Sequence, residues 1–150
     1  MLTKHDLLLK NPGSYRCKFP WKITSKISFP LGTSRELASS FFQLKIGYGY
    51  LKSYLYRLGH SISDLCWCGH KETIKHLLLS CKELKEARRK LQDSLGASRL
   101  NLRLLLHTTT GIEKTLNFLK ETRVVTRKWH LERKEEVREV GEKELDELVA

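Results

Sequence analysis

A stripe of seven apolar residues dominates the middle of the chain. Its members recur at alternating intervals of four and three, the spacing of one face of an α-helix. Just before it, Thr33-Ser34-Arg35-Glu36 has the pattern of a capping box, so we expect a helix to start there and Gly59 to end it. Gly47 and Gly49 each cost about 1 kcal/mol relative to alanine inside a helix, so a break or kink at 46–50 fits the pattern as well as one continuous helix does, and two shorter helices fit equally well. The stripe consists of Leu37, Phe41, Leu44, Tyr48, Leu51, Leu55 and Leu58.

Shorter helical segments follow the stripe. We expect helices over 71–79 and 99–106, and between them a helix that stops at Gly96. A second capping box, Thr110-Gly111-Ile112-Glu113, opens another helix. The sequence therefore predicts a mainly α, small helical domain. Its predicted core consists of Leu37, Phe41, Leu44, Leu51, Leu55, Leu77, Leu84, Leu91 and Leu116.

The two ends of the chain differ from its middle. Residues 1–32 hold all three prolines and show no sustained period, so we expect an irregular lead-in with one short strand around 21–29. Residues 33–127 form the predicted helical domain. From 128 to 150 the charges alternate in sign and apolar residues become rare, which indicates a solvated, charged helical tail.

Charge separates the body of the chain from this tail. The 150 residues carry 28 Lys and Arg against 17 Asp and Glu, a net charge of +11. Residues 1–127 alone carry +14, which is the electrostatic footprint of a protein that binds phosphate polymers. No apolar run approaches the roughly 18 residues of a membrane span, and the N-terminus lacks a secretory signal. We therefore expect a soluble intracellular protein, nuclear or cytoplasmic, without a membrane partner.

Three cysteines and one histidine lie within a short stretch, in the pattern C-x-C-x7-H-x4-C. Soft thiolates and an imidazole at such spacing can complete a closed tetrahedral site for structural Zn²⁺, and an intracellular setting favours metal over disulfides. The alternative is that the four side chains are unrelated core or surface groups. His70 and Cys17 are reserve ligands. The predicted ligands are Cys66, Cys68, His76 and Cys81.

Basic and aromatic residues flank this array on both sides. Aromatic faces can stack on unpaired bases, and we expect Trp67, between two cysteines, to be exposed for this purpose. Tyr48 belongs to the apolar stripe, so we expect it in the core. The candidate nucleic-acid-binding residues are Lys45, Lys52, Arg57, Trp67, Lys82, Lys85 and Arg89.

Two parts of the chain carry a resemblance to a known family. The first is the segment 42–55, which includes Phe42-Gln43-Leu44-Lys45-Ile46-Gly47-Tyr48-Gly49-Tyr50-Leu51. The second comprises Cys66-Trp67-Cys68-Gly69, Glu72-Thr73, His76-Leu77-Leu78 and Cys81. They resemble the C-terminal region of fungal non-LTR retrotransposon polyproteins, which follows the reverse transcriptase and RNase H domains. The similarity covers roughly residues 30–130. One departure is that Ile46-Gly47-Tyr48 stands where the family has Thr-Gly-His, so a role for that histidine does not carry over.

The resemblance implies a zinc-knuckle-like element that helps such a polyprotein hold template RNA or target DNA, next to its other domains. The chain would then be a fragment, a decayed copy or a separately expressed remnant. Catalysis by RNase H or reverse transcriptase needs converging carboxylates, whereas the only aspartates here are Asp6, Asp64, Asp93 and Asp146. We therefore expect no enzyme activity. The competing interpretation is a protein–protein interaction module whose basic charge serves only solubility.

Overall fold

The computed structural model describes residues 27–133 and 149, and over these it is mainly helical. Most of the predicted lead-in and most of the predicted charged tail lie outside the described residues. Residues 27–32, the described end of the lead-in, contain no strand. Within the described chain, extended pairing is limited to an isolated antiparallel bridge between Leu65 and Lys71. The helices are α3 (Arg35–Ile46), α4 (Lys52–Arg57), α5 (Ile74–Leu79), α6 (Lys85–Leu95), α7 (Leu102–His107) and α8 (Thr109–Thr122).

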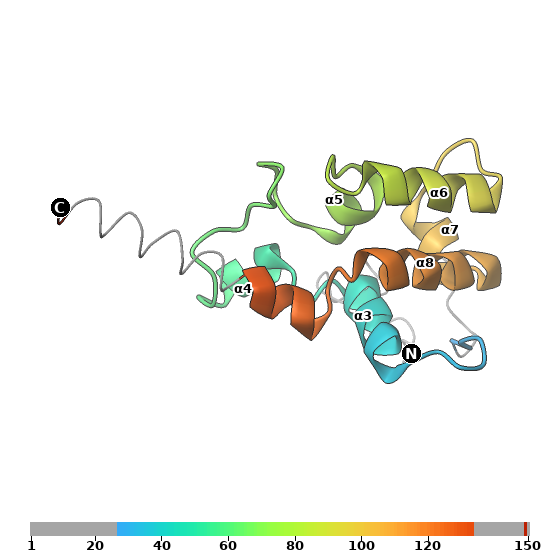
Figure 1. The fold of residues 1–150 in the computed structure, drawn as a ribbon, viewed down its shortest axis with the longest axis horizontal. Helices are drawn as coiled ribbons and strands as arrows, with labels where there is room; N and C mark the ends of the chain where they lie inside the picture. Colours follow the sequence, from blue (N-terminus) through green and yellow to red (C-terminus); the bar gives the residue numbers. More distant parts are fainter. Residues whose placement is uncertain (1–26, 134–148, 150) are drawn as a thin grey trace, which may run out of the picture.

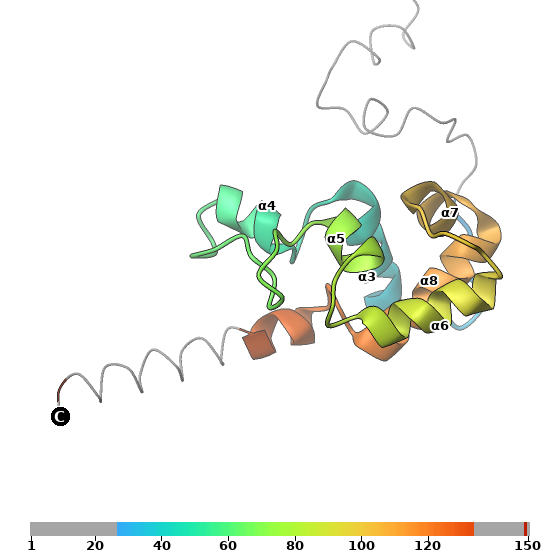
Figure 2. The ribbon, with the colours of Figure 1, turned by 90° about the horizontal axis from the view of Figure 1, so that it is seen from above.

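The long helix α8 is the centre of the packing, because α3, α6 and α7 all contact it. Figures 1 and 2 show α6, α7 and α8 grouped at one end of the fold, with α4 at the other end and α3 between them. The loop from 58 to 73, which joins α4 to α5, lies beside α4 and carries two of the candidate metal ligands. After α8 the chain forms a further helical stretch over 127–133.

The sequence left open whether the first apolar stripe forms one continuous helix or two, and the structure has a break that divides it into α3 and α4. Gly47 ends α3 in the left-handed conformation, with φ of 78°, which a residue with a Cβ adopts only with strain. The backbone N–H of Tyr50 then donates to Oε1 of Gln43 at 3.0 Å, so a side chain of α3 holds the linker in place. Two shorter helices, and not one continuous helix, are therefore the outcome.

The N-terminal caps lie close to the predicted capping boxes but use different residues. Ser34 caps α3, since its Oγ accepts a hydrogen bond from the N–H of Leu37 at 3.2 Å, while the hydroxyl of Thr33 donates to the carbonyl of Pro30. Thr108 caps α8, because its Oγ1 accepts from the N–H of Gly111 at 3.0 Å. Helix α8 therefore begins two residues earlier than the capping box at Thr110 predicts.

The core follows the predicted apolar faces with a few differences. Leu37 and Leu84 are only partly buried against the core, and Leu55 is half-buried and lies outside the main cluster. The prediction that Tyr48 belongs to the core is wrong, since 37% of its surface is exposed. Helix α3 ends before Tyr48, so the ring leaves the face that it would share with Leu44 in a continuous helix. The predicted residues that are buried are Phe41, Leu44, Leu51, Leu77, Leu91 and Leu116.

Candidate metal centre and basic surface

A tight turn brings the two cysteines of the C-x-C pair together. The N–H of Cys66 donates to the carbonyl of His70 at 2.7 Å, and the N–H of Gly69 donates back to the carbonyl of Cys66 at 2.9 Å. Gly69 has φ of 86°, a value that favours glycine, so this residue allows the chain to reverse direction. The turn explains how one intervening residue can suffice to direct two thiols to one side.

Helix α5 delivers the histidine and returns the chain to the third cysteine. The side chain of Thr73 caps α5 by accepting a hydrogen bond from the N–H of His76 at 3.1 Å. His76 is buried on the inner face of the helix. After α5 ends at Leu79, the N–H of Cys81 still donates to the carbonyl of His76 at 2.8 Å, which holds Cys81 against the end of the helix.

The four predicted ligands meet at one point. Their sulfur and nitrogen ligand atoms all lie within 4.8 Å of one another, close enough to hold a metal ion. The Sγ atoms of Cys66 and Cys81 are 3.7 Å apart, and Sγ of Cys68 is 3.0 Å from Nε2 of His76. Of the described cysteines none forms a disulfide. The reading of these four as unrelated side chains is therefore not supported.

The thiols of Cys66 and Cys68 differ in their ease of ionisation. Burial raises the pKa of Cys66 to about 12, with smaller contributions from the nearby Cys81 and Glu72, although a hydrogen bond from the backbone of Cys68 opposes the shift. Burial also raises the pKa of Cys68, but hydrogen bonds from the backbone and side chain of His70 outweigh it and lower the value to about 6. Metal binding needs thiolates, so a bound cation would displace the proton of Cys66.

His70 lies next to the cluster without being part of it. Its Nδ1 is 3.6 Å from Sγ of Cys68, and its ring stacks on that of His76 with 5.7 Å between the ring centres. His70 is exposed, whereas His76 is buried. Of the two reserve ligands, His70 is therefore placed to support Cys68, and Cys17 lies outside the described residues.

Two residues outside the predicted ligand set hold the chain around the cluster. Arg88, on α6, donates to the carbonyl of Cys81 at 2.8 Å. Glu72 is fully buried, and its Oε1 accepts a hydrogen bond from the N–H of Lys52 at 2.9 Å while its Oε2 accepts one from Arg133 at 2.7 Å. The motif Glu72-Thr73 in the family resemblance was the one available signal for Glu72.

The candidate nucleic-acid-binding residues fall into four groups. Lys52 lies with its ammonium 5.0 Å from the centre of the Trp67 ring, and 54% of Trp67 is exposed as expected. Arg57 is exposed at the end of α4. Lys45, by contrast, is buried, and this burial lowers its pKa, so it does not lie on the exposed surface. The remaining candidates are exposed and lie next to Cys81 or on α6: Lys82, Lys85 and Arg89.

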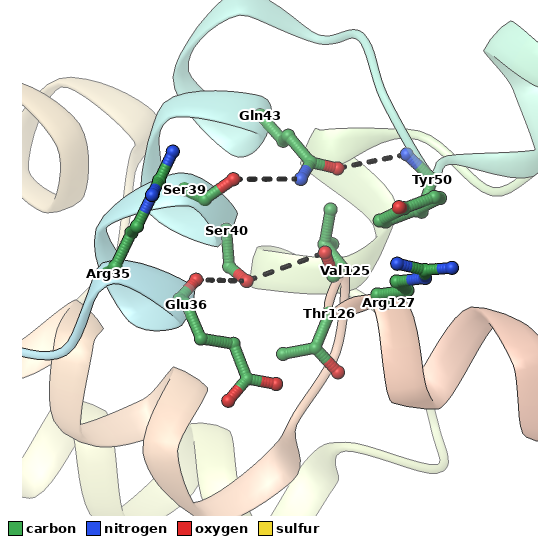
Figure 3. Close-up of a pocket in the computed structure, with 9 residues that line it drawn as sticks. All are labelled: Arg35, Glu36, Ser39, Ser40, Gln43, Tyr50, Val125, Thr126 and Arg127. Atoms are coloured by element: carbon green, nitrogen blue, oxygen red, sulfur yellow. Dashed lines mark hydrogen bonds between the residues drawn. The ribbon is translucent and has the colours of Figure 1, made fainter.

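A separate pocket of about 290 Å³ lies between α3 and the segment that follows α8 (Figure 3). Its walls include Glu36, Tyr50 and Arg127. The hydroxyl of Ser40 donates to the carbonyl of Val125 at 3.4 Å, which links the two walls. Charges of both signs line the pocket, and its hydrogen bonds hold α3 against the segment that follows α8. The pocket is therefore part of the packing between these two elements.

Among the described helices, none has both the length and the apolar character that crossing a membrane requires. A comparison of the chain with family models, curated proteins and solved structures finds no match. The function must therefore be inferred from the side chains and their geometry.

Proposed function

We propose that this chain is a non-catalytic module that binds RNA, with DNA as the other candidate, and that a structural Zn²⁺ holds its 58–73 loop against α5. The observation that carries the proposal is the position of Trp67. This exposed ring lies between two metal-ligand candidates and has the ammonium of Lys52 5.0 Å from its centre. An exposed aromatic ring beside a cation is the pairing that single-stranded nucleic acids use, through base stacking and phosphate contact.

The choice of zinc rests on the chemistry and spacing of the donors. Three thiolates and one imidazole form a soft set that suits tetrahedral Zn²⁺. Zn–S bonds of about 2.3 Å and Zn–N bonds of about 2.0–2.1 Å place tetrahedral sulfurs about 3.8 Å apart, and a sulfur and a nitrogen about 3.6 Å apart. The separation of 3.7 Å between Cys66 and Cys81 fits this geometry, and the 3.0 Å between Cys68 and His76 requires a small opening.

A non-catalytic role follows from the proposed coordination. All four ligands come from the chain, so the ion would keep no position for water or substrate, which is typical of structural zinc. When bound, the ion would supply a cross-link between the turn at Cys66 and the end of α5. The proposed link to retrotransposon polyproteins rests on the motif resemblance alone, and it would place this module beside a reverse transcriptase that supplies the chemistry.

The test is a titration of zinc-loaded full-length protein with labelled RNA and DNA strands at several salt concentrations. Phosphate contacts by four to six cations give a log–log salt slope of about −3 to −4 on single strands. Replacing Lys82, Lys85 and Arg89 together by alanine should flatten the slope and weaken all sequences alike. The matched control replaces Arg103, Lys120 and Lys128, exposed cations outside the candidate groups, and should change the slope less.

Two outcomes would overturn the proposal. The first is that neither RNA nor DNA binds at micromolar protein and low salt. The second is binding that salt does not weaken, since apolar docking releases no counterions. Either result would favour the protein-interaction alternative, for which the exposed Leu58, Ile62 and Leu65 of the 58–73 loop would be the contact residues.

A further inference from the structure

A cavity of about 450 Å³ opens beside α4, on the 58–73 loop and apart from the four metal-ligand candidates. This volume lies in the usual range for small-molecule sites, about 300–1,000 Å³. Its walls come from the linker after α3, from α4 and from both sides of the loop. The side chains that give the cavity its chemistry are Tyr48, Tyr54, Tyr56, Arg57, Asp64 and Lys71.

The aromatic wall is open to solvent. The rings of Tyr48 and Tyr54 lie 4.8 Å apart between centres with 43° between their planes, and Tyr48 and Tyr56 are 37% and 52% exposed. Arg57 holds its guanidinium carbon 5.8 Å from the centre of the Tyr48 ring and 5.4 Å from that of Tyr54. The wall therefore offers aromatic faces with a cation above them, and such faces accept any planar base.

The opposite wall is polar and charged. The ammonium of Lys71, itself 64% exposed, lies 3.7 Å from the carboxylate of Asp64. A lysine and an arginine at the mouth can contact a phosphate, and a carboxylate can accept a hydrogen bond from the exocyclic amine of a base. An aliphatic peptide side chain could contact the rings, but it would offer no hydrogen-bonding or charged partner to these polar groups.

We propose that this cavity is a subsite for one unpaired nucleobase, which stacks on Tyr48 and Tyr56 while Arg57 and Lys71 contact the adjoining phosphates. The inference rests on the proposed function and deepens it, because it names the part of the nucleic acid that is recognised.

The experiment separates bases from phosphates. Zinc-loaded full-length protein is titrated with a 12-nucleotide cytidine strand and with an abasic strand of the same length, so that the number of phosphates is constant. Each base–aromatic stack, on Trp67 or in the subsite, should make the cytidine strand bind about 5- to 150-fold more tightly. A Tyr48→Leu, Tyr56→Leu double variant should lose at least about 5-fold of this preference and leave the abasic strand unaffected.

Matched variants keep the result interpretable. Tyr48→Phe retains the ring and should retain the preference. Phe42→Leu removes an aromatic residue that is 43% exposed on α3 but lies outside the cavity lining, and it should behave like the parent protein. Zinc content and circular dichroism of each variant verify that the fold is intact; if the double variant fails this check, Tyr56→Leu alone takes its place with the same expected direction.

Each remaining outcome decides against one proposal or both. Equal affinity for the two strands would leave binding through phosphate contacts in place, but it would overturn the base subsite and base stacking on Trp67. A base preference that survives the Tyr48→Leu, Tyr56→Leu changes but disappears in Trp67→Ala would also overturn it, because Trp67 would be the stacking ring. Failure of the parent protein to bind either strand would overturn both proposals.

Discussion

The guanidinium of Arg133 donates a hydrogen bond of 2.7 Å to Oε2 of Glu72, and the two side chains are only 6% and 0% exposed. A second nitrogen of Arg133 donates to the carbonyl of Tyr50 at 3.1 Å, and the guanidinium lies over the ring of Trp129 at 3.4 Å. Glu72 in turn holds the start of α4. One ion pair thus connects the chain after α8, the linker after α3 and the loop of the candidate metal centre.

Breaking this pair should be costly. In Arg133→Met the buried carboxylate of Glu72 loses its counter-charge, and removing one partner of a buried pair typically destabilises by about 3–5 kcal/mol. Lys128→Met is the matched control, because Lys128 is 77% exposed and its contact with Glu132 is 3.8 Å long. We expect a loss of at most about 1 kcal/mol there. Urea unfolding of zinc-loaded protein measures both, and equal losses would contradict the role of the ion pair.

Metal removal should loosen only part of the fold. We expect one zinc per chain, bound through the Cys66, Cys68, His76 and Cys81 cluster, and faster hydrogen exchange over 60–82 once a chelator removes it, because metal binding is coupled to local folding. The amides of α8 should keep their protection, since α8 packs on α3, α6 and α7.

Elemental analysis and amide exchange make the measurement. Cys81→Ser should bind zinc less tightly than the parent protein, and Ser80→Ala, which alters the exposed neighbour, should bind it equally well. Zinc content near zero after purification without chelator would contradict the site, and a Cys81→Ser variant identical to the parent would exclude that ligand.

Local features of this fold could be predicted from the sequence. The four ligands lie within one short segment, so a turn and a capped helix suffice to bring them together. The break after α3 was one of the alternatives that the sequence left open, and the local conformation of Gly47 accounts for it. The exposure of Trp67 was likewise predicted, and both neighbouring cysteines belong to the ligand cluster while Trp67 does not.

Features that depend on distant residues could not be predicted. Glu72 and Arg133 are far apart in sequence, and nothing in either local pattern links them. Lys45 is a different case, because it lies four residues after the buried Phe41 and so shares its helix face. Its positive charge suggested a surface position, but its place in the helical period favoured burial.

Gly111 should tolerate no larger side chain, although it lies inside a helix. A Cβ there would collide with the backbone carbonyl of Leu104 and lie 2.6 Å from Oγ1 of Thr108, because the first turn of α8 sits directly on α7. Gly111→Ala gains helix propensity of about 1 kcal/mol, but overpacking against backbone typically costs about 1–3 kcal/mol. We therefore expect a net loss of stability in urea unfolding. Asn117→Ala, at an exposed position of the same helix, should be neutral or slightly stabilising, and a Gly111→Ala variant that behaves like it would refute the close contact.

His107 should make the fold less stable as the pH falls. Burial, together with the positive charges of Lys45 and Arg103, lowers its pKa to about 4. The unfolded chain, with a histidine pKa of about 6.5, therefore binds more protons than the folded protein between these two values. The stabilising contribution is fully present above about pH 6.5 and is lost as the pH falls toward 4.

His107→Gln removes this titration, so the difference in unfolding free energy between parent and variant should shift in favour of the variant from pH 7 to pH 5. Other titrating groups cancel in that difference. Asn117→Ala serves as the control, since its difference from the parent should not change with pH, and a pH-independent difference for His107→Gln would rule out the buried neutral imidazole.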